Sequence, residues 1–428
     1  MIILYSNIIS PRLQYICRFI FEQQLGISFL ITNDHSYFNN STAFKLNYSY
    51  ESLVAADWQL RPHKLLFEND IKPQDCDCFI YNQRKAFFKN GATDFPFDIL
   101  AASFYLISRY EEYLPHSKDS YGRYAHENSL AWKNNFLDQP LVNFWIFDFA
   151  RILIEKGLKD EIRFPEFKTE ISYDIDIAWS YRYKGIKRNL GGLIRKPSLN
   201  RLLVLTCMKK DPFDCYDYLN EIHRRKNIKA IYFFLAAEKN GEYDKQILPS
   251  CRAMQTLIRK HAALHETGLH PSWQSHSDYA VFSAEKNLLE TITGKEVTRS
   301  RQHYIWFTLP THYEWLLKAG ITDDYSMGYG SINGFRASTA SVFQWYNLAT
   351  ESETGLTIHP FCFMDANCYY EQRLNTKETY DELLKYMKLC KQSNGVFSCI
   401  FHNHFLGDDP MFKGWKELHQ QFTSLLLQ

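Results

Sequence analysis

The chain has 428 residues, of which 45% are hydrophobic and 16% aromatic, so it is long enough for two domains or for one barrel with a large appendage. Its formal net charge of +1 at pH 7 excludes a strong overall field that would attract nucleic acid or an anionic membrane. The start of the chain is unlike a signal peptide and no apolar run reaches membrane-spanning length, so we expect a cytoplasmic protein without a membrane span.

Residues 1–165 predict a smaller α/β accessory domain. Short apolar segments alternate with polar connectors over the first 90 residues, and helical patterns follow at 97–113 and up to about residue 156. Nothing in this segment is typical of a catalytic site. We interpret the carboxylates of Asp98, Glu111 and Glu112 as groups that cap or solvate a helix, rather than as a site.

Residues 166–428 show short apolar strands that alternate with helical stretches, which is typical of parallel β/α units. The predicted strands are 170–176, 229–236, 266–270, 297–304, 321–326, 356–361 and 396–402. Predicted helices between them include 215–226, 254–265, 313–319 and 377–391. Seven strands with crossover helices predict an α/β fold of the distorted (β/α)7-type barrel class.

Polar residues gather at the ends of these predicted strands, where the active site of such a barrel lies. They are Asp174 and Asp176 on the first strand, His270 on the third, Arg301 and His303 on the fourth, and His402 on the last. The two aspartates are two residues apart and face the same side, so their charges repel unless a cation lies beside them. Taken alone, the pair is also compatible with a loop of solvated aspartates, and each histidine is a weak signal.

In order and spacing, this set resembles the polysaccharide deacetylase family, the carbohydrate esterases with NodB homology. The resemblance covers roughly residues 168–428 and is clearest at 172–176, where Ser-Tyr-Asp-Ile-Asp is similar to the aspartate motif of the family's first strand, and at 266–273, which is similar to its glycine-histidine segment. Segments 107–113 and 121–123 resemble a bacterial subgroup in which a domain of unknown function precedes the deacetylase domain.

The resemblance implies a divalent metal, with zinc as the expected ion, bound by Asp176 and His270. Gln274 stands where the family has its second ligand histidine. We prefer His303 as the third ligand because imidazole suits a zinc-like site, and Gln274, His276 and a water remain the alternatives.

The same resemblance implies the catalytic roles. Asp174 is expected to be the general base, oriented by a bidentate pair with Arg301, and His402 the general acid that protonates the leaving amine. The base and the metal ligand can also be exchanged between Asp174 and Asp176. The implied function is removal of N- or O-acetyl groups from a glycan or glycan precursor, with no nucleic acid or protein partner.

Two other functions fit the same residues: a catalytically weakened carbohydrate-binding protein on this scaffold, and a metal-dependent hydrolase of cyclic amides. Beside the first strand lie basic residues that either grip anionic groups of a glycan or belong to a solvated loop; these are residues 184–188, Arg195, Lys196 and Arg201. Aromatic residues near the motifs either stack on sugar rings or pack in the core; they are Trp179, Tyr181, Trp273 and Trp306.

Overall fold

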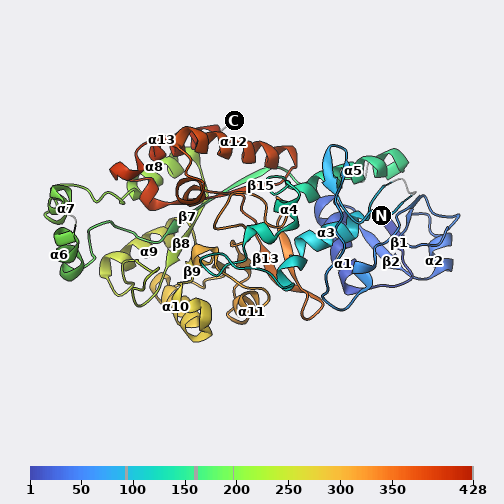
Figure 1. Ribbon diagram of the computed structural model, residues 1–428, viewed down its shortest axis with the longest axis horizontal. Coiled ribbons are helices and arrows are strands. Elements are labelled where there is room, and N and C mark those ends of the chain that lie inside the picture. The colour runs from blue at the N-terminus through green and yellow to red at the C-terminus, as the bar shows by residue number, and fades with distance from the viewer. Residues whose placement is uncertain (92–94, 159–161, 196, 427–428) are drawn as a thin grey trace.

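The computed structural model describes residues 1–91, 95–158, 162–195 and 197–426 and has an α/β fold (Figure 1). The N-terminal segment has a parallel sheet of order β2-β1-β3-β4, a small antiparallel hairpin and five α-helices within its described residues. The strands are β1 Ile2–Tyr5, β2 Phe29–Thr32, β3 Phe44–Asn47, β4 Trp58–Gln59, β5 Phe79–Tyr81 and β6 Arg84–Ala86. The helices are α1 Pro11–Cys17, α2 His35–Asn40, α3 Ile99–Ile107, α4 Leu130–Lys133 and α5 Leu141–Leu153.

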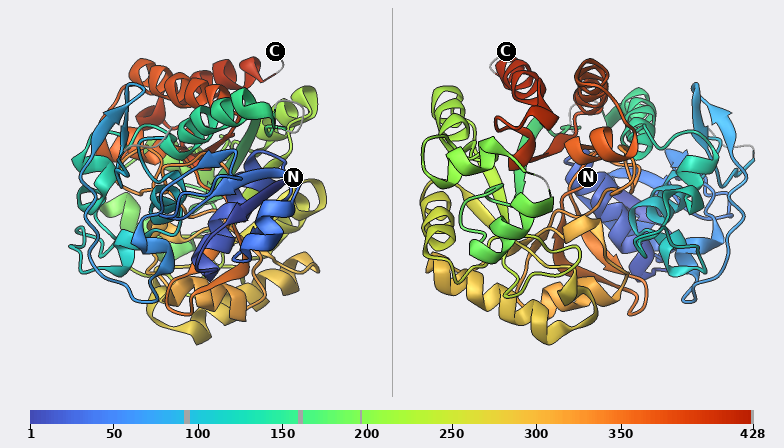
Figure 2. Two further views of the ribbon diagram at one scale, coloured as in Figure 1. Left: turned by 90° about the vertical axis from the view of Figure 1, so that its right-hand side faces the viewer. Right: turned by 60° about the vertical axis from the view of Figure 1, so that its left-hand side comes forward.

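The rest of the chain forms a larger sheet of order β12-β13-β11-β10-β9-β8-β7-β15-β14. Its strands are β7 Lys168–Ile175, β8 Ala230–Leu235, β9 Glu266–His270, β10 Arg299–Ser300, β11 Asp323–Asp324, β12 Phe343–Asn347, β13 Ser352–Ile358, β14 Phe363–Met364 and β15 Val396–His402. Its helices are α6 Ile186–Arg195, α7 Leu199–Leu205, α8 Tyr216–Lys226, α9 Arg252–Leu264, α10 Tyr279–Thr293, α11 Thr311–Lys318, α12 Thr376–Gln392 and α13 Trp415–Leu425. Helices α8 to α13 surround the sheet (Figure 2).

All seven predicted strands are present in this sheet, although β10 and β11 contain only two residues each, far fewer than predicted. Neighbouring strands are parallel except for β12, which is antiparallel to β13. Among the described residues, no backbone pairing joins the edge strands β12 and β14, so the sheet does not close into a complete barrel. Residues of the N-terminal segment cover β12 instead, where the Tyr15 hydroxyl donates to the carbonyl of Gln344 at 2.7 Å. A covered edge is protected from pairing with another chain.

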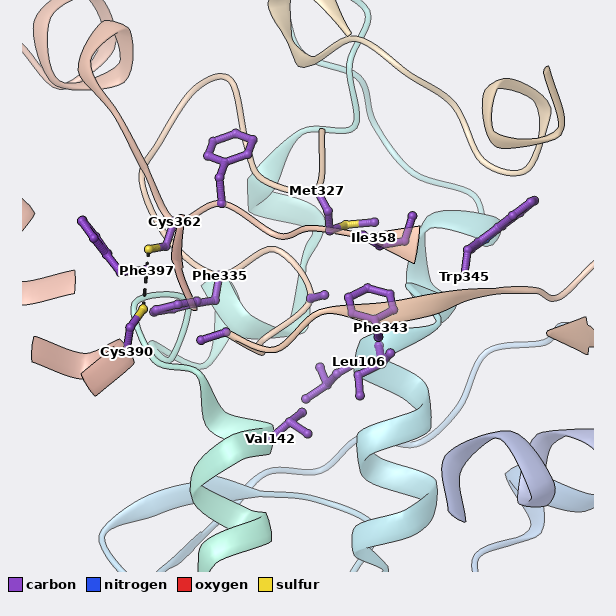
Figure 3. Close-up of a cluster of buried hydrophobic side chains, with 14 of the residues drawn as sticks. Leu106, Val142, Met327, Phe335, Phe343, Trp345, Ile358, Cys362, Cys390 and Phe397 are labelled. Atoms are coloured by element: carbon purple, nitrogen blue, oxygen red, sulfur yellow. Dashed lines mark hydrogen bonds between the residues drawn. The ribbon is translucent and has the colours of Figure 1, made fainter. Parts of the chain in front are cut away.

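The N-terminal segment shares one continuous hydrophobic core with the larger sheet. In Figure 3, Leu106 of α3 and Val142 of α5 lie next to Phe343 of β12. The side-chain amide of Asn143 donates to the Ser341 hydroxyl at 2.8 Å across the same contact. The division of the chain at residue 165 stays a prediction, but the two segments pack against each other as parts of one molecule.

The carboxylates of the N-terminal segment behave in two different ways. Asp98 caps α3 as predicted, because its carboxylate accepts from the backbone N–H groups of Leu100 and Ala101 at 3.0 and 3.1 Å. The expectation that Glu111 and Glu112 are solvated is wrong, since only 8% and 5% of their surface is exposed. They lie in ion pairs that the sequence does not reveal.

Glu112 joins the two segments through a buried pair of arginines. Its carboxylate accepts from Arg109 Nε at 2.7 Å and from Arg336 Nε and Nη2 at 2.8 and 2.6 Å. Burial favours the neutral carboxyl, but the charges of Arg336 and Arg109 outweigh it and lower the pKa of Glu112 to about 2. Because the folded pKa lies below the ordinary value, ionised Glu112 stabilises the fold above about pH 4.5, and this contribution is lost as the pH falls towards 2.

Glu112→Gln is therefore expected to lower the free energy of unfolding at pH 7 by about 3 kcal/mol, because it removes the carboxylate partner of the buried Arg336 and leaves Arg109 with Glu111 alone. The difference from the unmodified protein should shrink below about pH 4.5. Denaturant unfolding at pH 7 and pH 3 measures both effects. Glu127→Gln, at a side chain that is 59% exposed, is the control. An equal shift of the two variants would contradict the expected role of the buried pair.

Candidate functional site

The predicted site residues meet at the carboxyl ends of neighbouring strands. Asp174 lies on β7 opposite His402 of β15, and His270 ends β9. Arg301 and His303 follow β10 directly. The parallel register brings these strand ends to one edge of the sheet, which is why Asp174 and His402, 228 positions apart in sequence, line the same cavity.

Three side chains form a cluster that can hold a metal ion: Asp176, His270 and His303. His270 Nε2 lies 3.2 Å from Asp176 Oδ1, and His303 Nε2 lies 3.8 Å from Asp176 Oδ2. Asp176 Oδ1 is buried and has no hydrogen-bond partner among the described residues. A buried carboxylate oxygen without a donor is costly unless a cation or a proton satisfies it, so the donor set fits a divalent metal.

The outer nitrogens of both histidines are held by acceptors. His270 Nδ1 lies 2.5 Å from the carbonyl oxygen of Arg301, and His303 Nδ1 lies 3.1 Å from Asp244 Oδ1. Because these oxygens only accept, each Nδ1 carries the hydrogen, and in a neutral ring the Nε2 lone pair faces Asp176. This arrangement is typical of the groups that orient metal-binding histidines.

The contacts within the cluster shift the pKa values of Asp176 and His303. Burial disfavours an ionised Asp176, but His303, His270 and His402 outweigh it and hold the pKa of Asp176 well below its usual value. Burial also disfavours a charged His303, yet Asp176 and Asp244 raise the pKa of His303 to about 9. The site thus attracts positive charge, whether a proton or a metal ion supplies it.

Of the other candidates for a third ligand, neither residue lies in this cluster. Gln274 donates through Nε2 to Asp244 Oδ2 at 3.0 Å, and His276 stacks on Trp306 with ring centres 3.3 Å apart. The geometry therefore favours His303 over Gln274 and His276.

Asp174 and Arg301 form a buried ion pair beside the cluster. Arg301 Nη1 donates to Asp174 Oδ1 at 2.8 Å, and its Nη2 donates to the Ser172 hydroxyl at 2.8 Å. The expected bidentate pair is wrong, since only one guanidinium nitrogen reaches the carboxylate. Arg301 is fixed on its other side by the carbonyl of Tyr325 at 3.1 Å and by the ring of Phe233 beneath its guanidinium. Asp174 Oδ2 remains free to face His270 Nε2 at 3.9 Å.

His402 is held on the opposite side of the cavity by Asp365, which the sequence interpretation missed. The Nδ1 of His402 lies 2.6 Å from Asp365 Oδ1, and its backbone N–H donates to Asp365 Oδ2 at 2.7 Å. The Nε2 of His402 lies 3.7 Å from Asp176 Oδ2. Burial lowers the pKa of His402, but Asp365, Asp176 and Asp174 outweigh it and raise the pKa to about 10.

The N-terminal segment also reaches the cavity, although nothing in its sequence is typical of a catalytic site. Tyr121 and Arg123 line the cavity of about 280 Å³ that holds the cluster. Arg123 Nη1 donates to the carbonyl of Tyr304 at 3.0 Å. Tyr304 and Ile305 both have positive φ, at 59° and 56°, so Arg123 stabilises a strained turn directly after His303.

The predicted aromatic and basic residues lie elsewhere. The aromatic residues that line the cavity are Tyr121, Tyr304 and Tyr370 rather than the predicted ones; Trp273 packs behind Tyr304, with ring centres 5.4 Å apart. Of the basic segment, Lys196 lies outside the described residues, and none of the described members lines the cavity.

Residues 2–158 match the model of a family of unknown function, DUF7033. No curated protein sequence matches the chain. Among the solved structures to which the chain is similar are polysaccharide deacetylases from Mycobacterium smegmatis, at 12% identity over 61% of this chain and 85% of that one, with a TM-score of 0.39, and from Pseudomonas aeruginosa PAO1, at 10% identity over 60% and 84%, also 0.39.

A pseudoenzyme of the CE4 family from Bacillus anthracis is a further structural neighbour. It is 10% identical over 61% of this chain and 66% of that one, with a TM-score of 0.29. At these scores the likeness does not establish an activity for this chain.

Proposed function

We propose that this protein is a metal-dependent hydrolase that removes N- or O-acetyl groups from a glycan or glycan precursor. The observation that supports it is the convergence of His270 Nε2, His303 Nε2 and the unpartnered oxygen of Asp176 in one cavity. Beside them lie an aspartate held by arginine and a histidine held by aspartate. This is the set of groups that acyl transfer to water requires.

Two imidazole nitrogens and one carboxylate oxygen suit zinc or a similar ion and leave a coordination position open. When bound, such an ion supplies Lewis-acid polarisation of the acyl oxygen and lowers the pKa of an attacking water. Asp176, His270 and His303 would hold it.

The remaining residues move protons. Asp174 accepts the proton of the attacking water, and its hydrogen bond to Arg301 keeps the carboxylate aimed into the cavity. His402 donates a proton to the departing nitrogen or oxygen, and Asp365 fixes the orientation of its ring. An amine cannot leave as an anion, so the second transfer is required for an amide substrate.

The N-terminal segment gives the cavity part of its wall. Tyr121 and Tyr304 lie with ring centres 5.4 Å apart, and Arg123 connects the two loops. Aromatic rings with a few polar groups are suited to the faces of a sugar. We infer that residues 119–124 contribute to the choice of glycan.

The first test measures metal content and acetate release together. The protein, loaded with zinc and with other divalent ions in parallel, is incubated with acetylated oligosaccharides and with cyclic ureides. We expect release of acetate that a chelator stops and metal restores. Hydrolysis of the ureides alone would assign the site to cyclic amides, and glycan binding without metal uptake would assign it to a binding protein.

Asp244→Asn tests the group that orients His303. We expect the affinity for zinc to fall about 10- to 100-fold, because the amide is a weaker acceptor for the ring N–H and can present its own donor there instead. Competition with a chromophoric chelator measures the change. Gln274→Ala is the matched control, since its side chain contacts Asp244 and not the cluster. A larger loss in the Gln274 variant would restore Gln274 as a ligand candidate.

A further inference from the structure

Residues 180–210 differ in charge from the rest of the chain. They contain nine lysines and arginines and no aspartate or glutamate, although the whole chain has a net charge of only +1. The nine are Arg182, Lys184, Lys187, Arg188, Arg195, Lys196, Arg201, Lys209 and Lys210. A block of this kind forms a local positive field in a protein that is otherwise slightly acidic.

The described part of this segment contains two short helices, α6 and α7, which lie at one end of the molecule (Figure 1) and are called the α6–α7 hairpin below. Eight of the twenty exposed large hydrophobic side chains of the described chain lie within it. They are Tyr183, Ile186, Leu190, Ile194, Leu199, Leu202, Leu205 and Met208. Scattered single exposures are common, but this concentration marks an interaction surface.

The apolar residues lie on defined helix faces. On α6, Ile186, Leu190 and Ile194 are spaced four residues apart and therefore share one face. Ile186 is 86% exposed and Ile194 75%. On α7, Leu199 and Leu202 are 72% and 47% exposed. The hairpin thus presents hydrophobic side chains to the surroundings with basic side chains interspersed.

This combination fits one occupant better than the others. A second copy of the hairpin would bring two strongly positive segments together. A nucleic acid would match the charge but offers no apolar surface for the leucines and isoleucines. An anionic bilayer satisfies both, because apolar side chains enter the region between headgroups and acyl chains while lysines and arginines remain at the headgroups.

The hairpin also lies close to the functional cavity. It follows β7, so Ile186 is only ten residues beyond Asp176. Arg188 Nη2 donates to the carbonyl of Lys245 at 3.2 Å. Lys245 lines a second hollow, of about 320 Å³, whose wall also includes Asp176, Tyr304 and Tyr370. The base of the hairpin therefore contacts a residue that lines a hollow shared with Asp176 of the cluster.

We propose that the α6–α7 hairpin docks the protein peripherally onto an anionic lipid bilayer. Resting on the proposed function, this makes the substrate an acetylated glycan that is anchored in the same membrane. The docking surface itself does not depend on the activity. Among the described residues no helix is long and apolar enough to cross a membrane.

Flotation of the full-length protein with vesicles tests this inference. The vesicles contain phosphatidylcholine alone or phosphatidylcholine with phosphatidylglycerol. We expect at least about tenfold tighter binding to the anionic vesicles, weakened by added salt. The triple variant Ile186→Ser, Leu190→Ser and Ile194→Ser should lose this binding by about tenfold or more. The matched control replaces Ile8, Val54 and Leu264, which are also exposed, with serine and should bind like the unmodified protein.

Several results would contradict the proposal that the hairpin docks on a bilayer. They are no binding of the unmodified protein to anionic vesicles, equal binding by the hairpin variant, and a dimer in solution that the hairpin variant converts to monomers without any vesicle binding. Metal content and acetate release from a soluble glycan are measured on the same samples. Vesicle binding without activity would contradict the proposed function alone, and activity without vesicle binding would contradict the docking alone.

Discussion

Replacing Asp176 with alanine is expected to abolish both metal binding and hydrolysis, whereas replacing Asp174 with asparagine should slow hydrolysis without loss of the metal. Asp176 belongs to the cluster that can hold a metal, while Asp174 Oδ1 is already occupied by Arg301. For Asp174→Asn we expect kcat to fall about 10²- to 10⁴-fold, which is the usual contribution of a general base. Its metal content should remain stoichiometric.

Metal analysis and single-turnover acetate release on the same preparations separate the two roles. Asp217→Asn, at an aspartate whose side chain is 80% exposed, should match the unmodified protein in both measurements. Loss of metal in the Asp174 variant with retention in the Asp176 variant would show that Asp174 is the metal ligand and Asp176 the general base. Retention of metal in both would remove the cluster as the metal site.

The position of these aspartates was predictable from the sequence because parallel strands end at a common edge. The alternation of apolar segments and helices predicted all the strands that carry the site residues. The parallel register of β7, β8, β9 and β15 then brings the ends of these strands together. The roles of Asp174, Arg301 and His402, and of the three ligands, stay predictions until variants are measured.

The supporting groups were not predictable for physical reasons. Asp365 follows β14, a strand of only two residues that has too few apolar positions to show a period. Asp244 comes from the irregular loop after β8, where no pattern links it to His303 at 59 residues' distance. The contact of Arg123 with Tyr304 spans 181 residues. Such contacts depend on how loops fold over the strand ends, which local sequence does not encode.

Long-range contacts of the N-terminal segment were likewise not predictable from local sequence. Residues 107–113 fall in a predicted helical pattern, and residues 107–113 and 121–123 carry a family resemblance, but neither observation predicts the long-range contacts that these residues make. Glu112 pairs with Arg336, and Gly122 has a φ of 78° that lets its carbonyl accept from Trp306 Nε1 at 3.1 Å. A side chain at residue 122 would be strained in that conformation. A segment expected to be accessory therefore shapes the loop that holds His303.

His402→Ala is expected to distinguish substrates by their leaving groups. For an N-acetylated sugar, kcat should fall about 10²- to 10⁴-fold, because the departing amine must receive a proton as the C–N bond breaks. For an activated aryl acetate the loss should stay within about tenfold, since a phenolate with a low pKa leaves without a proton. Asp365→Asn should also lower kcat more for the N-acetylated sugar than for the aryl acetate. Both losses should be smaller than in His402→Ala, because the ring of His402 remains and only its charged acceptor at 2.6 Å is lost.

His404 provides the matched control for this experiment. Its ring centre lies 5.4 Å from that of His402 and it lines the same cavity, but it is outside the hydrogen-bonded pair with Asp365. His404→Ala should affect the amide and the aryl ester to a similar extent. Equal losses on both substrates in His402→Ala would show that His402 acts before the leaving group departs, by binding the metal or the acyl group. Its Nε2, 3.7 Å from Asp176, is close enough for that role, so the comparison of leaving groups decides between the two.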